Sequence, residues 1–216
     1  MKKYQDIYPS EPILNSKELD PNLASDLLTL EYFEAEPSTM PAEVFDQHHI
    51  LINLNENAHR VENWRGEEYR DFTFQQGEIV VTPAGMKSGW KWHEKSKVIV
   101  ITLDPERFNE FAQNEVGVVL SDRQLSDVPQ FKDEDLCQAA EFVYESLDSK
   151  KLGFEVMFES LARVFLVKLI QKYGEAEELD FGVGFSSNQY KRVLDFIKAN
   201  FGDSISLEDL ANQAGI

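Results

Sequence analysis

The sequence predicts a mainly β fold with α-helices in its C-terminal half. Between residues 27 and 103, turn residues separate short runs rich in valine, isoleucine, threonine and aromatic residues: LLTLEYFEA, HHILINL, HRVENW, EYRDFTF, EIVVTP and KVIVITL. Short strands at such regular spacing are typical of a β-sandwich or β-barrel. After Leu103, apolar residues recur at helical spacing instead. We therefore expect a barrel followed by a helical segment.

The strongest helical pattern lies in residues 154–172, after a first helix that Asp104 and Pro105 are expected to start. Its apolar side chains cover most of the helix circumference, so both sides of the helix need a partner. The expected dimerisation residues are Phe154, Met157, Phe158, Leu161, Val164 and Phe165. We expect the barrel on one side and a second copy of the chain, forming a homodimer, on the other. The alternative is that neighbouring helices of the same chain cover both sides.

A segment without periodicity, residues 174–187, is rich in glycine and acidic residues and is predicted to be an interdomain linker. A helix follows it, and then a short helix that Ser206 caps together with Asp209. A helix, a short helix and a glycine turn form the start of a helix-turn-helix. The expected scaffold residues are Ile205, Ser206, Leu207, Leu210, Ala211 and Gly215.

The stretch VLDFIKANFGDSISLEDLANQAGI resembles the opening of the AraC/XylS-type DNA-binding domain. The resemblance lies in Phe196-Ile197, in residues 205–211 and in Ala214-Gly215. It implies a regulator with a ligand-sensing domain and paired helix-turn-helix units. The first recognition helix of that family should start just after Ile216. We therefore expect a truncated or processed fragment, with DNA contacted through the full-length parent rather than by this chain.

The formal net charge of −18 is consistent with that expectation. An acidic chain repels phosphate, so the charge argues against DNA binding by these residues themselves. No apolar run is long enough to span a bilayer, and no apolar stretch follows the N-terminal lysines. We expect a cytoplasmic protein without a membrane partner. The single cysteine, Cys137, is expected to be packed and inert.

Residues 77–85 resemble the second cupin motif, in which glycine, five residues, proline, one residue and glycine follow each other. The proline fixes φ and the glycine permits a turn that other residues resist. The resemblance implies a small barrel able to hold a small ligand. We expect a cupin-like sensing barrel over 1–110, a helical dimerisation segment over 111–173, the linker 174–187, and an incomplete helix-turn-helix domain over 188–216.

The candidate residues for binding a small-molecule effector are His48, Arg60, Trp64, Tyr69, Trp90 and Trp92. His48 shares a strand face with Ile50 and Ile52, which is predicted to be the inward face. Ligand pockets are mostly apolar with a few polar groups, and the tryptophans fit that description. The alternative for His48 and for the tryptophans is ordinary packing in the core.

Enzymatic cupins resemble this chain too, but they bind a metal through histidines one residue apart. Here His48 and His49 are adjacent and should point to opposite faces of a strand. Ser88 stands where the resemblance places a later histidine. We therefore expect no metal, no cofactor and no enzymatic activity. The expected function is effector sensing and dimerisation in a transcription regulator; the alternatives are a stand-alone cupin-type binding module and a small metal-dependent cupin enzyme.

Overall fold

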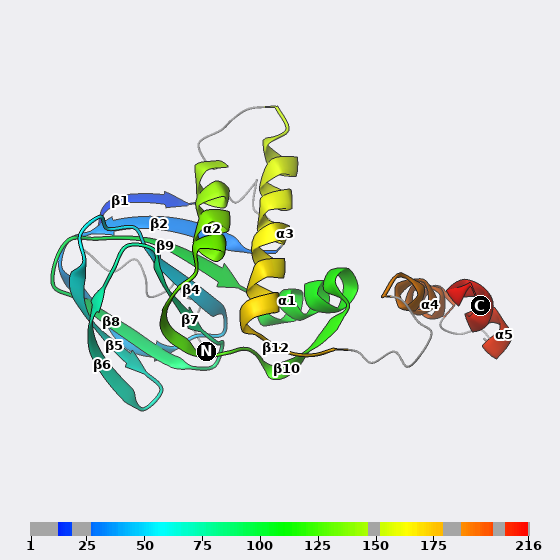
Figure 1. Ribbon diagram of the computed structural model, residues 1–216. Helices are drawn as coiled ribbons and strands as arrows, with labels where there is room; N and C mark the ends of the chain where they lie inside the picture. The colour runs from blue at the N-terminus through cyan, green and yellow to red at the C-terminus, as the bar shows by residue number, and fades with distance from the viewer. Residues whose placement is uncertain (1–12, 19–26, 147–151, 179–186, 201–205, 216) are drawn as a thin grey trace.

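Two antiparallel β-sheets form the N-terminal part of the molecule (Figure 1). The computed structural model describes residues 13–18, 27–146, 152–178, 187–200 and 206–215. The first sheet has the order β1-β2-β9-β4-β7-β11 and the second has the order β3-β8-β5-β6. Their strands are β1 (Ile13–Glu18), β2 (Thr29–Ala35), β3 (Ser38–Val44), β4 (His48–Asn53), β5 (His59–Arg65), β6 (Glu68–Phe74), β7 (Glu78–Thr82), β8 (Lys87–Trp92), β9 (Ser96–Leu103) and β11 (Val128–Lys132).

The strand order is that of a double-stranded β-helix. Strands β2 to β9 pass back and forth between the sheets, so that β2-β9-β4-β7 faces β3-β8-β5-β6. This is the jelly-roll arrangement of the cupins. It confirms the predicted mainly β, cupin-like fold with helices attached. Strands β1 and β11 extend the first sheet at its two edges.

The glycine–proline motif forms β7 and the turns at both of its ends. Gly77 and Gly85 have φ values of +73° and +79°, in the left-handed region that glycine adopts without strain. The Gly77 N–H donates to the Asn53 carbonyl, and the Gly85 N–H donates to the Phe45 carbonyl, both at 2.8 Å. The motif therefore ties one end of β7 to the end of β4 and the other end to Phe45, in the connection between β3 and β4.

Alternation along the strands divides the buried apolar side chains into two cores. The inner core lies between the two sheets and includes Phe33, Met40, Phe45, Leu51, Phe74, Val80, Trp90, Trp92 and Val100. The outer core lies on the opposite face of the first sheet and includes Leu30, Ile50, Ile52, Ile79, Ile99 and Ile101. Both faces of the first sheet are therefore buried.

Helices cover the outer face of the first sheet (Figure 1). The helix α1 (Pro105–Phe111) begins at Asp104, whose carboxylate accepts the N–H groups of Glu106 and Arg107, as predicted. It runs into the π-helical turn η2 (Ala112–Val116). The helices α2 (Glu134–Ser146) and α3 (Phe154–Tyr173) pack on each other and on the sheet. Within the described residues, no helix is long and apolar enough to cross a membrane.

Strands interrupt the segment that was expected to be helical, residues 111–173. They are β10 (Val118–Leu125) and β11, and β11 pairs with β7, so the barrel sheet continues past residue 110. The expected linker, residues 174–187, begins instead with the strand β12 (Gly174–Glu178), which pairs with β10. The polar sequence of this strand does not predict a strand, because main-chain pairing with the distant strand β10 stabilises it. Residues 179–186 lie outside the described part of the chain.

The apolar stripe of α3 is divided between the core and the surface. Phe154, Phe158 and Phe165 are buried in the outer core of their own chain. The expectation that these three residues contact a second copy is therefore wrong, because the sheet and α2 already cover them. Met157 and Val164 are 44% and 47% exposed, and Leu161 is partly buried.

The last two helices, α4 (Ser187–Ala199) and α5 (Leu207–Ala214), pack against each other and lie apart from the barrel in Figure 1. Ser206 and Asp209 form the predicted capping box. Gly215 ends α5 with a φ of +75°. The fully buried alanine of this pair is Ala214, whereas Ala211 and Leu210 are partly buried and Leu207 is 86% exposed. Ile205 lies outside the described residues.

Candidate functional site

The inward face of β4 is the opposite of the predicted one. His48, Ile50 and Ile52 lie under the helices, whereas His49 and Leu51 face the space between the sheets. Every residue of β4 is buried, so alternation of apolar and polar residues gives no signal of which face is inward. His48 and His49 do point to opposite faces, as their adjacency predicts.

His48 joins the first sheet to the segment that packs on it. Its Nδ1 accepts the Ala84 N–H at 3.0 Å, and its Nε2 lies 2.7 Å from Oε1 of Gln124 in β10. The ring also meets Phe108 of α1 edge-on, with centroids 5.6 Å apart. Burial lowers the pKa of His48. These contacts are those of a histidine packed in the core, which was the alternative. They do not place His48 in the barrel interior.

Three other candidate residues lie on the outer face of the second sheet. Arg60 forms a two-pronged pair with Asp71, with Nε–Oδ1 and Nη2–Oδ2 distances of 2.9 and 2.6 Å. Tyr69 is exposed and donates to Glu62 at 2.8 Å, and Trp64 packs on its ring. Arg60, Trp64 and Tyr69 therefore do not line the interior, contrary to expectation, because the other parity of β5 points inward.

Trp90 and Trp92 face the interior, a position that both alternatives share, the ligand-lining wall and ordinary core packing. They enclose a cavity of about 30 Å³ together with Met40, Leu51, Val61, Phe74, Ser96 and Val98. Trp90 stacks on Phe74, and Trp92 donates its Nε1–H to the Glu36 carbonyl at 2.6 Å. The cavity has room for about two water molecules. This end of the barrel is therefore filled by aromatic side chains in the conformation described.

The other end of the barrel interior is polar. Arg65 at the end of β5 has only 2% of its side chain exposed. It donates to Oγ1 of Thr82 and to the Val81 carbonyl, both at 2.7 Å, and it forms an ion pair with Asp127. Ser88 lies directly opposite Arg65 in the adjacent strand and is fully buried. The barrel therefore encloses a charged side chain almost completely, with partners from β7 and from the turn before β11.

His49 belongs to the same polar end. In the strand register it lies beside Thr82 and Thr102, and its ring meets Phe45 edge-on. Its pKa is lowered to about 3, first by burial and then by the positive charge of Arg65. The imidazole is therefore neutral at physiological pH. Sequence reasoning missed Arg65, because a charged residue beside Trp64 on a strand does not indicate an interior position by itself.

The donors that a metal would need are not gathered in this interior. Among the residues that the structure describes, no three histidine, cysteine, aspartate or glutamate side chains lie close enough together to hold a metal ion. Ser88 occupies the buried position that the enzyme resemblance gives to a histidine. The residues present therefore do not fit the metal of an enzymatic cupin.

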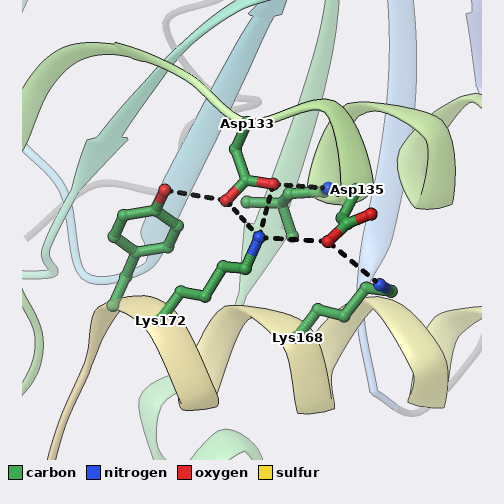
Figure 2. A network of polar contacts seen from close by, with 6 residues as sticks. Asp133, Asp135, Lys168 and Lys172 are labelled. Carbon is green, nitrogen blue, oxygen red and sulfur yellow. Dashed lines mark hydrogen bonds and ion pairs between the residues drawn. The ribbon is translucent and has the colours of Figure 1, made fainter.

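A polar junction ties the edge of the barrel to the end of α3 (Figure 2). Asp133, just after β11, accepts the Leu136 N–H at 3.0 Å and so caps α2. Its carboxylate also accepts from Lys172 at 2.8 Å and from the Tyr173 hydroxyl at 2.9 Å. Burial alone would raise the pKa of Asp133, but these bonds hold it below its usual value. Sequence reasoning missed this junction, because Asp133 lies about 40 positions before Lys172 and Tyr173.

Solved cupin structures are similar to part of this chain at low identity and low TM-score. No family model matches the chain, and no curated protein matches it. A cupin superfamily protein of Desulfitobacterium hafniense is 17% identical, with 43% of this chain and 78% of that chain covered and a TM-score of 0.35. A cupin 2 conserved barrel protein of Salinispora arenicola is 16% identical, with 46% and 82% covered and a TM-score of 0.36. An RmlC-like cupin of Methanocaldococcus jannaschii is 12% identical, with 47% and 90% covered and a TM-score of 0.36.

Proposed function

We propose that this chain is the ligand-sensing and dimerisation part of a transcription regulator of the AraC/XylS type. The single observation that carries the proposal is the helix pair α4–α5 after a jelly-roll barrel. The capping box of Ser206 and Asp209 starts α5, and Gly215 ends it in the left-handed region. Arg192 of α4 donates to the Ala214 carbonyl at 3.2 Å, which fixes the two helices at their crossing. A helix followed by a short capped helix and a glycine turn supports the proposal, because a helix-turn-helix begins with such elements.

The proposed mechanism is a shift in population. An effector that binds one arrangement of the barrel and helices more tightly favours that arrangement. The helix α3 carries the change, because it packs on the sheet through Phe158 and Phe165 and ends at the Asp133 junction. We propose that a second copy covers Met157, Leu161 and Val164, so that two DNA-binding domains of the full-length parent face two half-sites.

We do not propose an enzyme. The polar end of the barrel offers a cation, hydroxyl groups and a neutral imidazole, and Arg65 binds an acid by charge and shape rather than by reaction. A stand-alone cupin-type binding module is the second candidate. The interior of the jelly roll supports ligand binding by such a module as much as by a regulator. The two candidates differ only in whether DNA is bound.

The test has two arms. In the first, the chain is screened by thermal shift against metabolites, since a ligand that binds only the folded state raises its melting temperature. In the second, the full-length gene product and the 216-residue chain are compared by gel shift on the promoter of the gene. We expect the gene product to retard the promoter specifically and the chain to leave it free. Absence of DNA binding by the gene product would leave only the binding module.

A further inference from the structure

The deepest cation of the barrel is only partly satisfied by the protein. Among the described residues, the Nε–H of Arg65 has no hydrogen-bond acceptor, and the hydroxyl of Ser88 opposite it has no partner either. Both atoms are shielded from solvent. Buried donors of this kind are costly unless something accepts their hydrogen bonds. A hydrogen-bond acceptor from outside the protein would therefore gain the most binding free energy at this position.

The geometry of the guanidinium indicates the chemistry of that acceptor. Nε and Nη2 form one edge of the group, and a carboxylate binds such an edge with two parallel hydrogen bonds. At Arg65, Asp127 engages Nη2 and leaves Nε open. The Nε donor of this edge is therefore unused, and Ser88, opposite Arg65 in the adjacent strand, carries a second unpartnered hydroxyl. A ligand carboxylate has enough lone pairs to accept from Nε, Nη2 and the Ser88 hydroxyl together.

Asp127 reaches this edge from a turn and not from the barrel wall. It lies between β10 and β11, and its side chain is 30% exposed, whereas that of Arg65 is 2% exposed. Solvent therefore reaches the site on the side of Asp127. The neighbouring Ser126 N–H donates to the Tyr173 carbonyl at 2.9 Å. The turn that carries the acid is thus bonded to the last residue of α3.

We infer that Arg65 is a receptor for a small carboxylate ligand, and that Asp127 is an internal carboxylate that holds the site closed in the free protein. The inference rests on the proposed sensing function and gives the effector its chemical class. A ligand carboxylate displaces Asp127 and takes the Nε–Nη2 edge. The released turn then loosens its bond to Tyr173, next to β12. Binding of the ligand in the barrel is thereby linked to β12, the strand that precedes α4 in the sequence.

The test is chemical rescue by acetate. Asp127→Ala empties the acid's place and leaves a buried arginine without its counter-charge, so we expect a melting temperature lower by about 10 °C. Sodium acetate should raise it again along a saturable curve, by about 3–6 °C at ten times the half-saturating concentration. Half-saturation is expected on the order of 10 mM. Sodium chloride at the same ionic strength should have no saturable effect.

Three further variants make the result specific. Asp127→Asn keeps the size of the side chain and should fold and respond to acetate even where Asp127→Ala does not fold. The double variant Arg65→Gln/Asp127→Asn lacks the receptor and should lose the response. Asp122→Ala, on an exposed position of β10, is the matched loss of a surface acid and should behave like the original chain. An equal acetate response in all variants, or none in Asp127→Ala and Asp127→Asn, overturns the inference.

A second measurement examines the proposed link from the turn that carries Asp127 to Tyr173 and β12. Hydrogen exchange at the backbone of residues 126–128 and 173–178 should be faster in Asp127→Asn than in the original chain. Unchanged exchange in both segments would contradict the link to Tyr173. These outcomes are independent of the DNA assay. A regulator with a neutral effector still binds its promoter but shows no acetate rescue, whereas a carboxylate-binding module shows rescue without binding DNA.

Discussion

His48 and Gln124 are joined across the seam between the first sheet and β10, with 2.7 Å between Nε2 and Oε1. Since Nδ1 of His48 accepts the Ala84 N–H, the ring proton must lie on Nε2 and is donated to Gln124. To reach it, Gln124 adopts a φ of +64°, a left-handed conformation in a residue that is not glycine. The left-handed backbone of Gln124 is therefore held by its side-chain bond to a buried histidine and by the bond from its own N–H to the Ser121 hydroxyl, at 3.3 Å.

The first prediction separates that bond from the strain. Gln124→Ala should lower the free energy of unfolding by about 1–3 kcal/mol, because it leaves a buried donor of His48 unsatisfied. Gln124→Gly loses the same bond but removes the strain, so it should be about 1 kcal/mol more stable than Gln124→Ala. Urea unfolding measures both, with Asp122→Ala as the surface control. Equal stability of the alanine and glycine variants would contradict the strain.

The second prediction concerns pH. Burial lowers the pKa of His48, His49 and His59 in the folded chain, to about 3 for His49. Below the unfolded value of about 6.5, the unfolded chain therefore binds more protons than the folded chain. The stabilisation is complete above pH 6.5 and is lost as the pH falls from 6.5 towards each lowered pKa. Each histidine contributes a slope of up to about 1.4 kcal/mol per pH unit.

Urea unfolding at pH 7.5 and pH 5.5 tests this dependence. The chain should be less stable at pH 5.5, and His49→Gln should reduce the difference between the two values, because it removes the most deeply buried of the three rings. A stability that is the same at both pH values, or a His49→Gln variant with an unchanged difference, would show that these histidines do not remain neutral in the folded state.

Local signals account for the parts of the fold that were predicted correctly. Strand alternation and the Gly77–Gly85 motif predict a cupin-like barrel, because φ and turn geometry are set within a few residues. The helix starts at Asp104 and Ser206 follow from capping, which also acts over three or four positions. Such features depend on residues that are close together in the sequence, so the sequence alone predicts them.

Long-range features account for the parts that were not predicted. The inward face of β4 cannot be read from its sequence, because helices bury its other face equally. Arg65 is a charged residue that becomes intelligible as an interior one only when Asp127, 62 positions away, is placed beside it. The strand β12 is polar and exists through pairing with β10. In each case the deciding partner is distant in sequence.

The third prediction concerns the junction in Figure 2. Asp133→Ala removes the cap of α2 and the acceptor of Lys172 and Tyr173, so it should lower the free energy of unfolding by about 2–3 kcal/mol. Asp135→Ala is the matched control. Its side chain also contacts Lys172, at 3.3 Å, but is 62% exposed, so the expected loss is below about 0.5 kcal/mol. Similar losses for the two variants would show that the buried acid has no special role.

The fourth prediction concerns the surface of α3. Met157 and Val164 are large apolar side chains left exposed on a helix whose phenylalanines are buried, and we propose that a second copy covers them. Val164→Glu should weaken the dimer by about 100-fold or more, because association would bury an unpaired charge. Its melting temperature at low concentration should remain near that of the original chain, since the position is outside the core.

Sedimentation velocity over a concentration series measures this effect, with Glu110→Lys on the exposed side of α1 as the control for a change of charge. Phe165→Glu is unsuitable, because Phe165 is fully buried in its own chain and the variant would unfold rather than dissociate. A monomer of the original chain at tens of micromolar would contradict the dimer. A dimer that Val164→Glu leaves intact would place the contact elsewhere, and the route proposed from the barrel through α3 to a partner would then lack its last step.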